Sequence, residues 1–449
     1  MTTFIFCLAD SSYYKFPMFE QDEYFFSPDE QSPDGIRTFR IPPGSPSINT
    51  IIADNKTLSH LKPTFVFLKT DALKRNFVRD LSTLGCSSLV SVADTHHLYR
   101  PIEVVIDYLR KEEFTYISAE NDRHHLKWFK RAGFHNLLWL PNLALTPKQI
   151  QPRLHQTKDN MICFIGSVGK FHPFRTYLVD LLASKLKDNF IFKVASQDEA
   201  SFIYNRSLIS INISLNCDLN WRFFEILAAG GFLLSDRLPK QSGIDTLFIE
   251  GYHYEAYSTE QELLSKIHYY RSNPQHASII AQRGYKQFWL NSSSTIIRKQ
   301  LFKHIYLNRR DQNYIYPFPS KVNNFSPDCL LYLRAYQSLQ EIHRLNTHIF
   351  VVHDNDIPSG LLFDLKDFSR LVLIPYTDIV SIDENNLLFG QHPSYVLLLS
   401  SLHNWRQLLQ QDLFNGMHFD FVVSVKSDYI DHISLNQQTL SYDYEPSIN

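Results

Sequence analysis

Arg222 and Glu225 lie three residues apart in the segment "NWRFFEILAAGG" (220–231), where polar residues give way to apolar ones. The segment has helical spacing from about Asn220 and places both charges on one face of the first turns. A helix N-terminus presents free N–H groups, and Arg222 adds planar donors suited to a diphosphate. Glu225, one turn further, could accept two hydrogen bonds from a ribose diol. An intrahelical Arg–Glu pair is the alternative, but the apolar neighbours favour a ligand.

A second candidate for anion binding is the segment "FIGSVGKFHPFR" (164–175), which follows a predicted buried strand. Gly166 and Ser167 are small and would let a ligand approach the backbone. Lys170 and Arg175 bring positive charge, so the loop combines the two features that phosphate recognition needs. Its spacing matches neither common glycine-rich phosphate motif, and a solvated basic loop is the alternative.

The segment "SVADTHHLYRP" (91–101) groups Asp94, His96 and His97 after another predicted strand. A histidine oriented by an aspartate could act as general base for an acceptor hydroxyl. The cluster has no further ligands at zinc spacing, so a metal site is the weaker interpretation. A structural role, such as capping the following helix, is an equal alternative to catalysis.

The elements that would position these residues alternate as short apolar runs and amphipathic segments, which is the pattern of parallel α/β layers. In the first third of the chain we predict strands at 4–8, 64–68, 87–92, 115–119 and 136–141, and helices at 101–113 and 122–133. Beyond it we predict strands at 161–166, 189–195, 208–214 and 231–236, then a helical run over 259–305 interrupted near Asn273 and Asn291. Ligands in open parallel sheets bind at the carboxyl ends of strands, so the loops there are expected to carry the chemistry.

The composition excludes several classes of protein. The 449 residues are 44% hydrophobic and 20% charged, which is ordinary globular composition and enough for about three domains. A formal net charge of -2 gives no basic field for nucleic-acid binding. Five scattered cysteines without a CxxC pair favour reduced thiols over disulfides or zinc. We see neither a leader-like N-terminus nor an apolar run of about 20 residues, and we expect a cytoplasmic protein.

Two segments without periodic apolar residues, 146–160 and 309–328, divide the chain. We therefore expect domains at 1–150, 151–310 and 311–449. The last repeats the α/β pattern, with a predicted helix at 327–345 and predicted strands at 347–352, 370–376, 395–400 and 419–425. Asp354 and Asp356 form a DxD pair there, which could bind a divalent metal ion, but the following proline and glycine favour a turn.

The segment "NWRFFEILAAGGFLLSD" (220–236) resembles the group-1-type glycosyltransferases, in particular the subgroup that includes spore-maturation CgeB-like proteins. The likeness continues through "TEQELLSKIHYY" (259–270) and "IIAQRGYKQFW" (279–289), and back to 164–175. It covers residues 161–305 well, whereas the N-terminal third is compatible in pattern only.

The resemblance implies a GT-B fold, in which two Rossmann-like domains face each other and the second holds a nucleotide-sugar donor, usually without a metal. It implies that Arg222 and Lys170 contact the diphosphate and Glu225 the ribose, while Gly230 and the next glycine end the helix against the sheet. Many retaining members carry a second glutamate where this chain has Cys217, so the stereochemical outcome stays open. The residues expected to hold the donor are Gly166, Ser167, Lys170, Arg175, Asn220, Arg222, Glu225 and Gly230.

The favoured function is transfer of a sugar from a UDP- or GDP-linked donor to a glycan, protein or lipid-linked acceptor, without a metal ion. The alternatives are a nucleotide-sugar epimerase of the same fold and a non-catalytic scaffold that binds nucleotide or glycan. A lipid-linked acceptor would bring the protein to a membrane surface as a peripheral enzyme. The C-terminal module is a candidate for acceptor recognition or self-association, and no nucleic-acid partner is expected.

Overall fold

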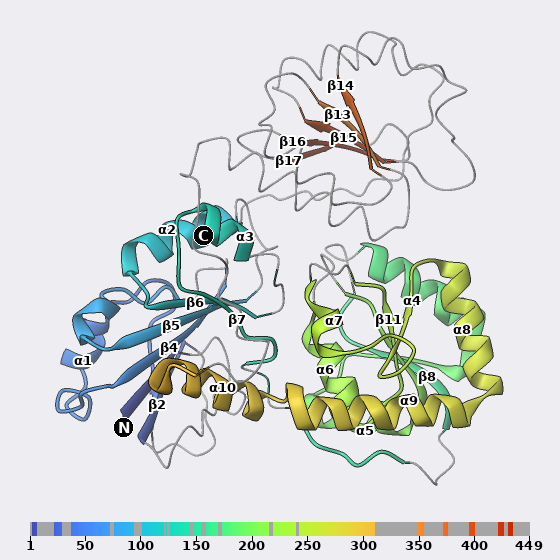
Figure 1. The fold of residues 1–449 in the computed structure, drawn as a ribbon, viewed down its shortest axis with the longest axis horizontal. Coiled ribbons are helices and arrows are strands. Elements are labelled where there is room, and N and C mark those ends of the chain that lie inside the picture. Colours follow the sequence, from blue (N-terminus) through green and yellow to red (C-terminus); the bar gives the residue numbers. More distant parts are fainter. Residues whose placement is uncertain are drawn as a thin grey trace.

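The computed structural model describes most of residues 2–309 and five strands beyond them (Figure 1). The described ranges are 2–6, 22–28, 37–71, 76–93, 101–120, 123, 126–143, 145, 147–153, 159–168, 173–214, 219–238, 242–309, 349–353, 371–375, 395–399, 421–425 and 430–433. In this part of the chain, no helix combines the length and the apolar character that crossing a membrane requires.

The first sheet is parallel throughout, with the strand order β3-β2-β1-β4-β5-β6-β7. Its strands are β1 Thr2–Phe6, β2 Asp22–Ser27, β3 Thr38–Arg40, β4 Phe65–Thr70, β5 Ser87–Val92, β6 Tyr116–Ala119 and β7 Leu137–Trp139. Its helices are α1 Ile48–Ala53, α2 Pro101–Glu112 and α3 Leu126–Arg131, with a 3-10 turn at Leu81–Leu84. The order is that of a dinucleotide-binding sheet, with its crossover between β1 and β4.

The second sheet is also parallel, with the order β12-β11-β10-β8-β9. Its strands are β8 Asp159–Ile165, β9 Phe190–Lys193, β10 Ser207–Asn212, β11 Leu233–Asp236 and β12 Glu255–Tyr257. The helices are α4 Pro173–Leu186, α5 Gln197–Arg206, α6 Trp221–Ala228, α7 Ile244–Leu247, α8 Glu260–Ser272, α9 Pro274–Gln287 and α10 Ser294–Leu307, with a 3-10 turn at Lys187–Asn189 and a π-helical turn at Phe288–Ser292. The predicted helical run is thus interrupted at Asn273, between α8 and α9, and again around Asn291.

Alternation along β8 explains how the second sheet is covered on both faces. Ile162 and Phe164 belong to an apolar cluster with residues of α4 and α8, whereas Cys163 and Ile165 pack with residues of α5 and α6. Successive side chains of a strand point to opposite faces, so a continuous apolar run is what a doubly covered parallel strand requires.

The two sheets approach each other at their carboxyl ends. Lys69, the second-last residue of β4, has its ammonium 4.3 Å from the centre of a Trp221 ring at the start of α6. Gly243, in the segment after β11, lies against Trp139 at the end of β7, where an added Cβ would stand 2.6 Å from the indole. Two parallel α/β units with facing carboxyl ends confirm the predicted α/β class and the GT-B architecture.

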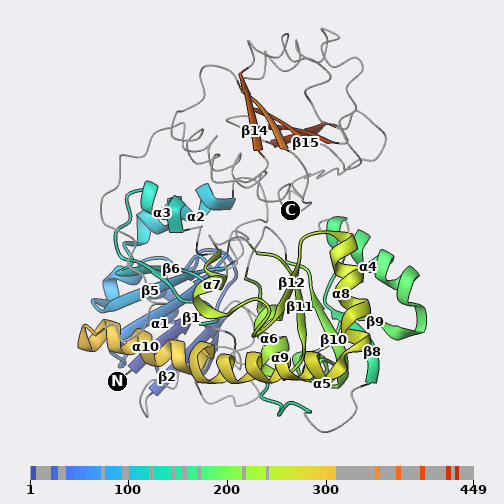
Figure 2. The same cartoon turned by 45° about the vertical axis from the view of Figure 1, so that its right-hand side comes forward.

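Helix α10 returns from the second unit to the first, beside the first sheet in both views (Figures 1 and 2). Arg298 donates from Nε to the Leu143 carbonyl at 3.1 Å, and the rings of His304 and Tyr116 lie 5.8 Å apart. By sequence α10 closes the segment 151–310, but by contact it packs on the first sheet.

A third sheet lies beyond residue 309, with the order β14-β13-β15-β16-β17. Its strands are β13 Ile349–His353, β14 Leu371–Pro375, β15 Tyr395–Leu399, β16 Phe421–Val425 and β17 Ile430–Ile433, of which the last is antiparallel. The four strands predicted in this segment are therefore present, and β17 was not predicted. The predicted helix at 327–345 and the pair Asp354 and Asp356 lie outside the described residues.

Candidate functional site

The candidate site lies where the second sheet reverses its strand order. After β8 the chain adds β9 on one side, then crosses to place β10 on the other side of β8. In open parallel sheets the crevice at such a switch point is the preferred ligand site. The residues that follow β8 and β10 are the ones predicted from the sequence, beginning with Gly166 after β8 and Asn220 after β10.

Helix α6 starts where the sequence predicts. Asn220 is its N-cap, and its side-chain oxygen accepts a hydrogen bond from Phe223 N at 3.2 Å. Arg222 is the second helical residue and Glu225 the fifth, while Phe223, Phe224 and the following apolar residues are buried. Burial of those residues fixes the helix on the sheet and directs the charged pair toward the strand ends.

Arg222 spans the carboxyl ends of β8 and β10. Its Nε donates to the Ile165 carbonyl at 2.5 Å, and its Nη1 lies 3.3 Å from both Asn212 Oδ1 and the Ile213 carbonyl. The guanidinium carbon is 4.4 Å from the centre of the Phe164 ring. Among the described residues no carboxylate oxygen lies within 4.0 Å of the Arg222 nitrogens, so only neutral partners hold its charge there.

Residue 166 must be a glycine because Arg222 occupies the space that a side chain there would need. Its φ is +153°, and a Cβ added to it would stand 2.0 Å from Arg222 Nη2. No side chain fits between this backbone and the guanidinium. From the sequence, a small residue was expected here because it lets a ligand approach the backbone. In the structure, the missing side chain also makes room for the Arg222 guanidinium.

Arg175, near the start of α4, ties the loop after β8 to the end of β10. It is buried, with 5% of its surface exposed, and donates to the Ser167 carbonyl at 3.3 Å and the Ile213 carbonyl at 3.0 Å. The Ile213 carbonyl therefore accepts from both Arg175 and Arg222. Two cations that share one neutral acceptor raise the positive potential at the switch point.

Glu225 is a partly buried carboxyl group with a perturbed pKa. Burial raises its pKa, and the positive charge of Arg222 partly offsets that rise. Buried Tyr204 lies in the same field: burial and then Glu225 raise its pKa, and its hydroxyl donates to the Ile165 carbonyl at 3.5 Å. The predicted pair is therefore electrostatically coupled within one helix and to α5.

Gly230, which was predicted both to end the helix and to belong to the donor set, lies at the carboxyl-terminal end of α6, and its part in donor binding stays a prediction. It follows Ala229, the C-cap of α6, and has φ +69°. The hydrogen bonds Gly230 N to Leu227 O at 3.1 Å and Gly231 N to Ile226 O at 2.9 Å form a Schellman motif. An eight-residue helix is about 12 Å long, which separates Gly230 from the N-terminal end. A Cβ on Gly230 would stand 2.8 Å from Pro152 Cα, so this glycine ends the helix against the linker.

Several predicted residues lie outside the described part of the chain. They are Lys170 of the loop after β8, Cys217 and the aspartate beside it, and the cluster of Asp94, His96 and His97 that follows β5. Among the described residues no group of three or more His, Cys, Asp or Glu side chains could hold a metal ion.

Lys69 and Glu120, at the carboxyl end of the first sheet, and Trp221, the first residue of α6, were not predicted as functional residues. Lys69 and Glu120 form an ion pair whose side chains are 3% and 0% exposed. The sequence does indicate Lys69, because a lysine follows the apolar residues of "FVFLK" (65–69). The predicted strand ended at residue 68 and so did not include it.

Comparison with known protein families finds a match for part of the chain. Residues 180–296, which include α6, match the family model described as "Glycosyl transferase-like". No curated protein sequence matches the chain. The match makes this segment glycosyl transferase-like, as the resemblance implied, and the CgeB-like subgroup stays a prediction.

Solved structures of glycosyltransferases are also similar, at low identity. Sucrose-phosphate synthase from Thermosynechococcus elongatus has 10% identity and a TM-score of 0.47 over 69% of this chain and 100% of its own. HepE from Anabaena, in complex with UDP and glucose, has 11% identity and a TM-score of 0.49 over 68% and 99%. The pneumococcal O-GlcNAc transferase GtfA, in complex with UDP and GlcNAc, has 11% identity and a TM-score of 0.36 over 56% and 58%. The fold is assigned from the strand orders above and not from these likenesses.

Proposed function

We propose that this protein transfers a sugar from a UDP- or GDP-linked donor to an acceptor hydroxyl of a glycan, protein or lipid-linked molecule, without a metal ion. The observation that carries the proposal is the placement of Arg222 at the switch point of the second sheet, held by neutral partners. The match of residues 180–296 to a glycosyl transferase-like family supports it.

The donor diphosphate would lie at the N-terminus of α6, where Arg222 offers planar donors and the helix offers its first N–H groups. When the acceptor oxygen attacks the anomeric carbon, the bond to the phosphate oxygen breaks and the nucleoside diphosphate leaves with the bonding electrons. The negative charge that develops on it is stabilised by fixed positive groups. Arg175 adds to the field from behind the loop, and Lys170 is proposed as a further phosphate contact.

Glu225 is proposed to accept hydrogen bonds from the two ribose hydroxyls. Its raised pKa means that folding disfavours its ionised form, because burial removes water from the carboxylate. Perturbed carboxyl groups of this kind are concentrated at functional sites. A bound diol would restore the hydrogen bonds that water no longer supplies.

The acceptor side is proposed to lie on the first sheet, within residues 1–150, with the donor in residues 151–310. His96 or His97, oriented by Asp94, would take the proton of the acceptor hydroxyl. Alanine at the histidine that serves as base should abolish transfer and leave donor binding intact, whereas full turnover by both single variants would give the cluster a structural role. Residues 311–449 are proposed as an additional module for acceptor recognition or self-association.

A thermal-unfolding screen over UDP, GDP and their common sugar conjugates, in the presence of EDTA, tests the proposal. A ligand at 100 times its Kd stabilises the folded state by about 2.7 kcal/mol, which corresponds to a rise in Tm of roughly 3 °C for a chain of this length. We expect such a rise with one nucleotide family, followed by release of the nucleoside diphosphate when acceptor is added. No stabilisation by any nucleotide would contradict the donor site, and binding without turnover of any sugar nucleotide would favour the scaffold alternative.

A further inference from the structure

The ion pair of Lys69 and Glu120 is placed where charges are costly. Every residue of β4 is buried, Lys69 is 2% exposed, and Glu120, which follows β6, is fully buried. A buried ion pair gives weak stabilisation at best, because the loss of hydration of both charges offsets their attraction. Stability alone therefore does not account for a lysine at the end of this strand.

Lys69 reaches out of its own sheet. Its ammonium lies 4.3 Å from the centre of a Trp221 ring, a distance at which the cation is attracted to the face of the indole. Trp221 is the first residue of α6, in the second unit, and precedes Arg222 directly. The contact thus joins the carboxyl end of β4 to the helix that carries the proposed phosphate ligand.

Helix α6 is well suited to transmit this contact. Its first turn is fixed by the Asn220 cap, its last by the Schellman motif, and five of its eight residues are buried. A displacement of Trp221 would move the first turn as a unit. Arg222, the next residue of that turn, would then move relative to the Ile165 carbonyl that its Nε contacts.

Glu120 also interacts with a cation from α10. Burial lowers the pKa of Arg298 to about 10, and the negative charges of Glu23 and Glu120 oppose that fall. Arg298 is itself buried and donates to the Leu143 carbonyl at 3.1 Å. Glu120 therefore interacts with two cations: Lys69, which contacts Trp221 of α6, and Arg298 of α10.

We propose that Lys69 is a positioning residue for the donor site: fixed by Glu120, it holds the Trp221 ring and thereby sets the start of α6 and the place of Arg222. The inference rests on the proposed function, because it concerns the same nucleotide site. It makes donor binding on the second sheet depend on a side chain of the first, although Lys69 does not touch the donor.

Calorimetric titration of the full chain with UDP or GDP, whichever stabilises it, tests the inference. Removing both charges with Lys69→Met and Glu120→Gln together avoids leaving a buried charge unpaired, and thermal unfolding shows that the variant is folded. We expect this variant to bind the nucleotide about tenfold more weakly, with kcat falling less than KM for the donor rises. Lys69→Arg, which keeps a cation able to pair and stack, should restore binding to within about threefold.

A double-mutant cycle with Trp221→Leu separates positioning from general stability. If Lys69 acts through the indole, Trp221→Leu alone weakens nucleotide binding similarly, and adding the Lys69/Glu120 changes weakens it no further. Unchanged affinity in the folded Lys69/Glu120 variant, or losses that add in full, would overturn the inference. If that variant binds normally while Arg222→Ala does not bind, the proposed function stands and only the inference fails. If the wild type binds neither nucleotide, both fail.

Discussion

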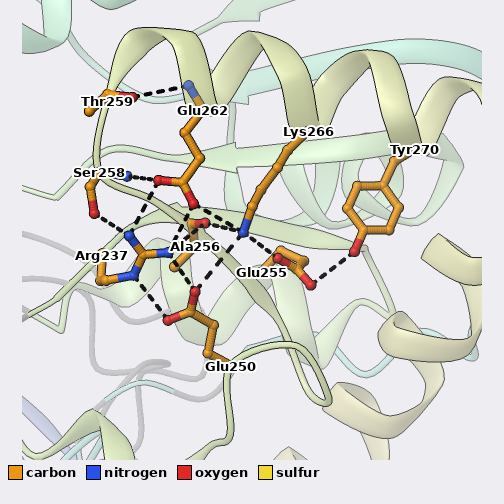
Figure 3. Close-up of polar contacts among 9 residues, drawn as sticks. All are labelled: Arg237, Glu250, Glu255, Ala256, Ser258, Thr259, Glu262, Lys266 and Tyr270. Carbon is orange, nitrogen blue, oxygen red and sulfur yellow. Dashed lines mark hydrogen bonds and ion pairs between the residues drawn. The ribbon is translucent and has the colours of Figure 1, made fainter.

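Arg222 and Arg237 lie beyond neighbouring strands of the second sheet, β10 and β11, but their guanidinium groups meet different partners. Arg237 donates two hydrogen bonds to Glu250, at 2.7 and 3.1 Å, and two to Glu262, at 3.0 and 3.3 Å (Figure 3). Lys266 lies 3.4 Å from Glu262 and 4.0 Å from Glu250, and pairs with a third carboxylate, that of Glu255, at 2.6 Å. Arg222, in contrast, has backbone carbonyls and one amide oxygen as its described partners.

The difference distinguishes a structural arginine from one available to an anion. In the Arg237 network three carboxylates exceed two cations, so an added phosphate would meet negative charge. The hydrogen bonds that Arg237 donates to Glu250 raise the pKa of Arg237. Burial alone would raise the pKa of Glu262, but the hydrogen bonds from Arg237 and Ser258 N hold that pKa below its usual value. At Arg222 the charge is uncompensated by any described carboxylate within ion-pair distance, and an anion would gain both hydrogen bonds and charge.

Gly166→Ala should produce the largest effect that tests this difference. The new methyl group would occupy the place of Arg222 Nη2, so the guanidinium must leave the strand ends. We expect nucleotide affinity to fall about 100-fold, the equivalent of roughly two charge-assisted hydrogen bonds. Gly85→Ala is the matched control, because φ is +62° and nothing lies within 4 Å of an added Cβ. Equal nucleotide affinities in both alanine variants would contradict the role of Gly166.

Arg237→Ala should do the reverse and lower stability without changing nucleotide binding. It removes the partner of Glu250 and of Glu262. Glu262 lies at the start of α8 and also accepts a hydrogen bond from Ser258 N at 2.8 Å. Because Arg237 is 38% exposed, solvent screens the network, and we expect a loss of about 1 kcal/mol in the free energy of unfolding. Chemical denaturation measures the loss, and calorimetry with the nucleotide should show affinity within about twofold of wild type. A marked loss of affinity would place the network in the donor site.

Glu225→Gln should weaken nucleotide binding less than Gly166→Ala does, and it should have a distinct pH dependence. The ionised carboxyl group is the form with two accepting oxygens, so affinity of the wild type should fall as the pH drops through a pKa above the usual 4.5. Folding has the opposite sign: a raised folded-state pKa favours the folded state at low pH and costs stability as the pH rises through it. The variant should bind several-fold more weakly at neutral pH, show a flat pH profile and unfold at a higher temperature.

The nucleotide analogue lacking both ribose hydroxyls provides the control for Glu225. Glu225→Gln should change affinity for the 2′,3′-dideoxy compound less than affinity for the parent nucleotide. Equal losses for the two compounds, or a wild-type pH profile in the variant, would show that Glu225 does not hold the ribose.

The buried strands and the ends of α6 could be predicted from the sequence because they depend on local patterns. β5 has the predicted bounds, and Asn220 and Gly230 mark the start and end of α6 through cap chemistry. β2, β3 and β12 were missed, because they are short or carry charged residues and lack a continuous apolar run.

Contacts between distant segments could not be predicted from one sequence. Arg222 and Ile165 are 57 residues apart, and only the fold shows that the arginine crosses from β10 to the end of β8. The same holds for Lys69 and Trp221, which lie in different units. The sequence shows a lysine at the end of an apolar strand and a tryptophan before an arginine. It does not show that these two residues are in contact, because that depends on how the two sheets face each other.

Titration of UDP and GDP into the wild type, Arg222→Ala and Arg206→Ala tests the central claim most directly. Arg206 is the matched control: it is exposed, ends α5 just before β10 of the same sheet, and pairs with Asp159 at 3.0 Å. We predict that Arg222→Ala loses at least about 100-fold in affinity for the bound nucleotide, whereas Arg206→Ala stays within about twofold. Wild-type affinity in a folded Arg222→Ala variant would contradict the placement of the donor diphosphate at the switch point of the second sheet.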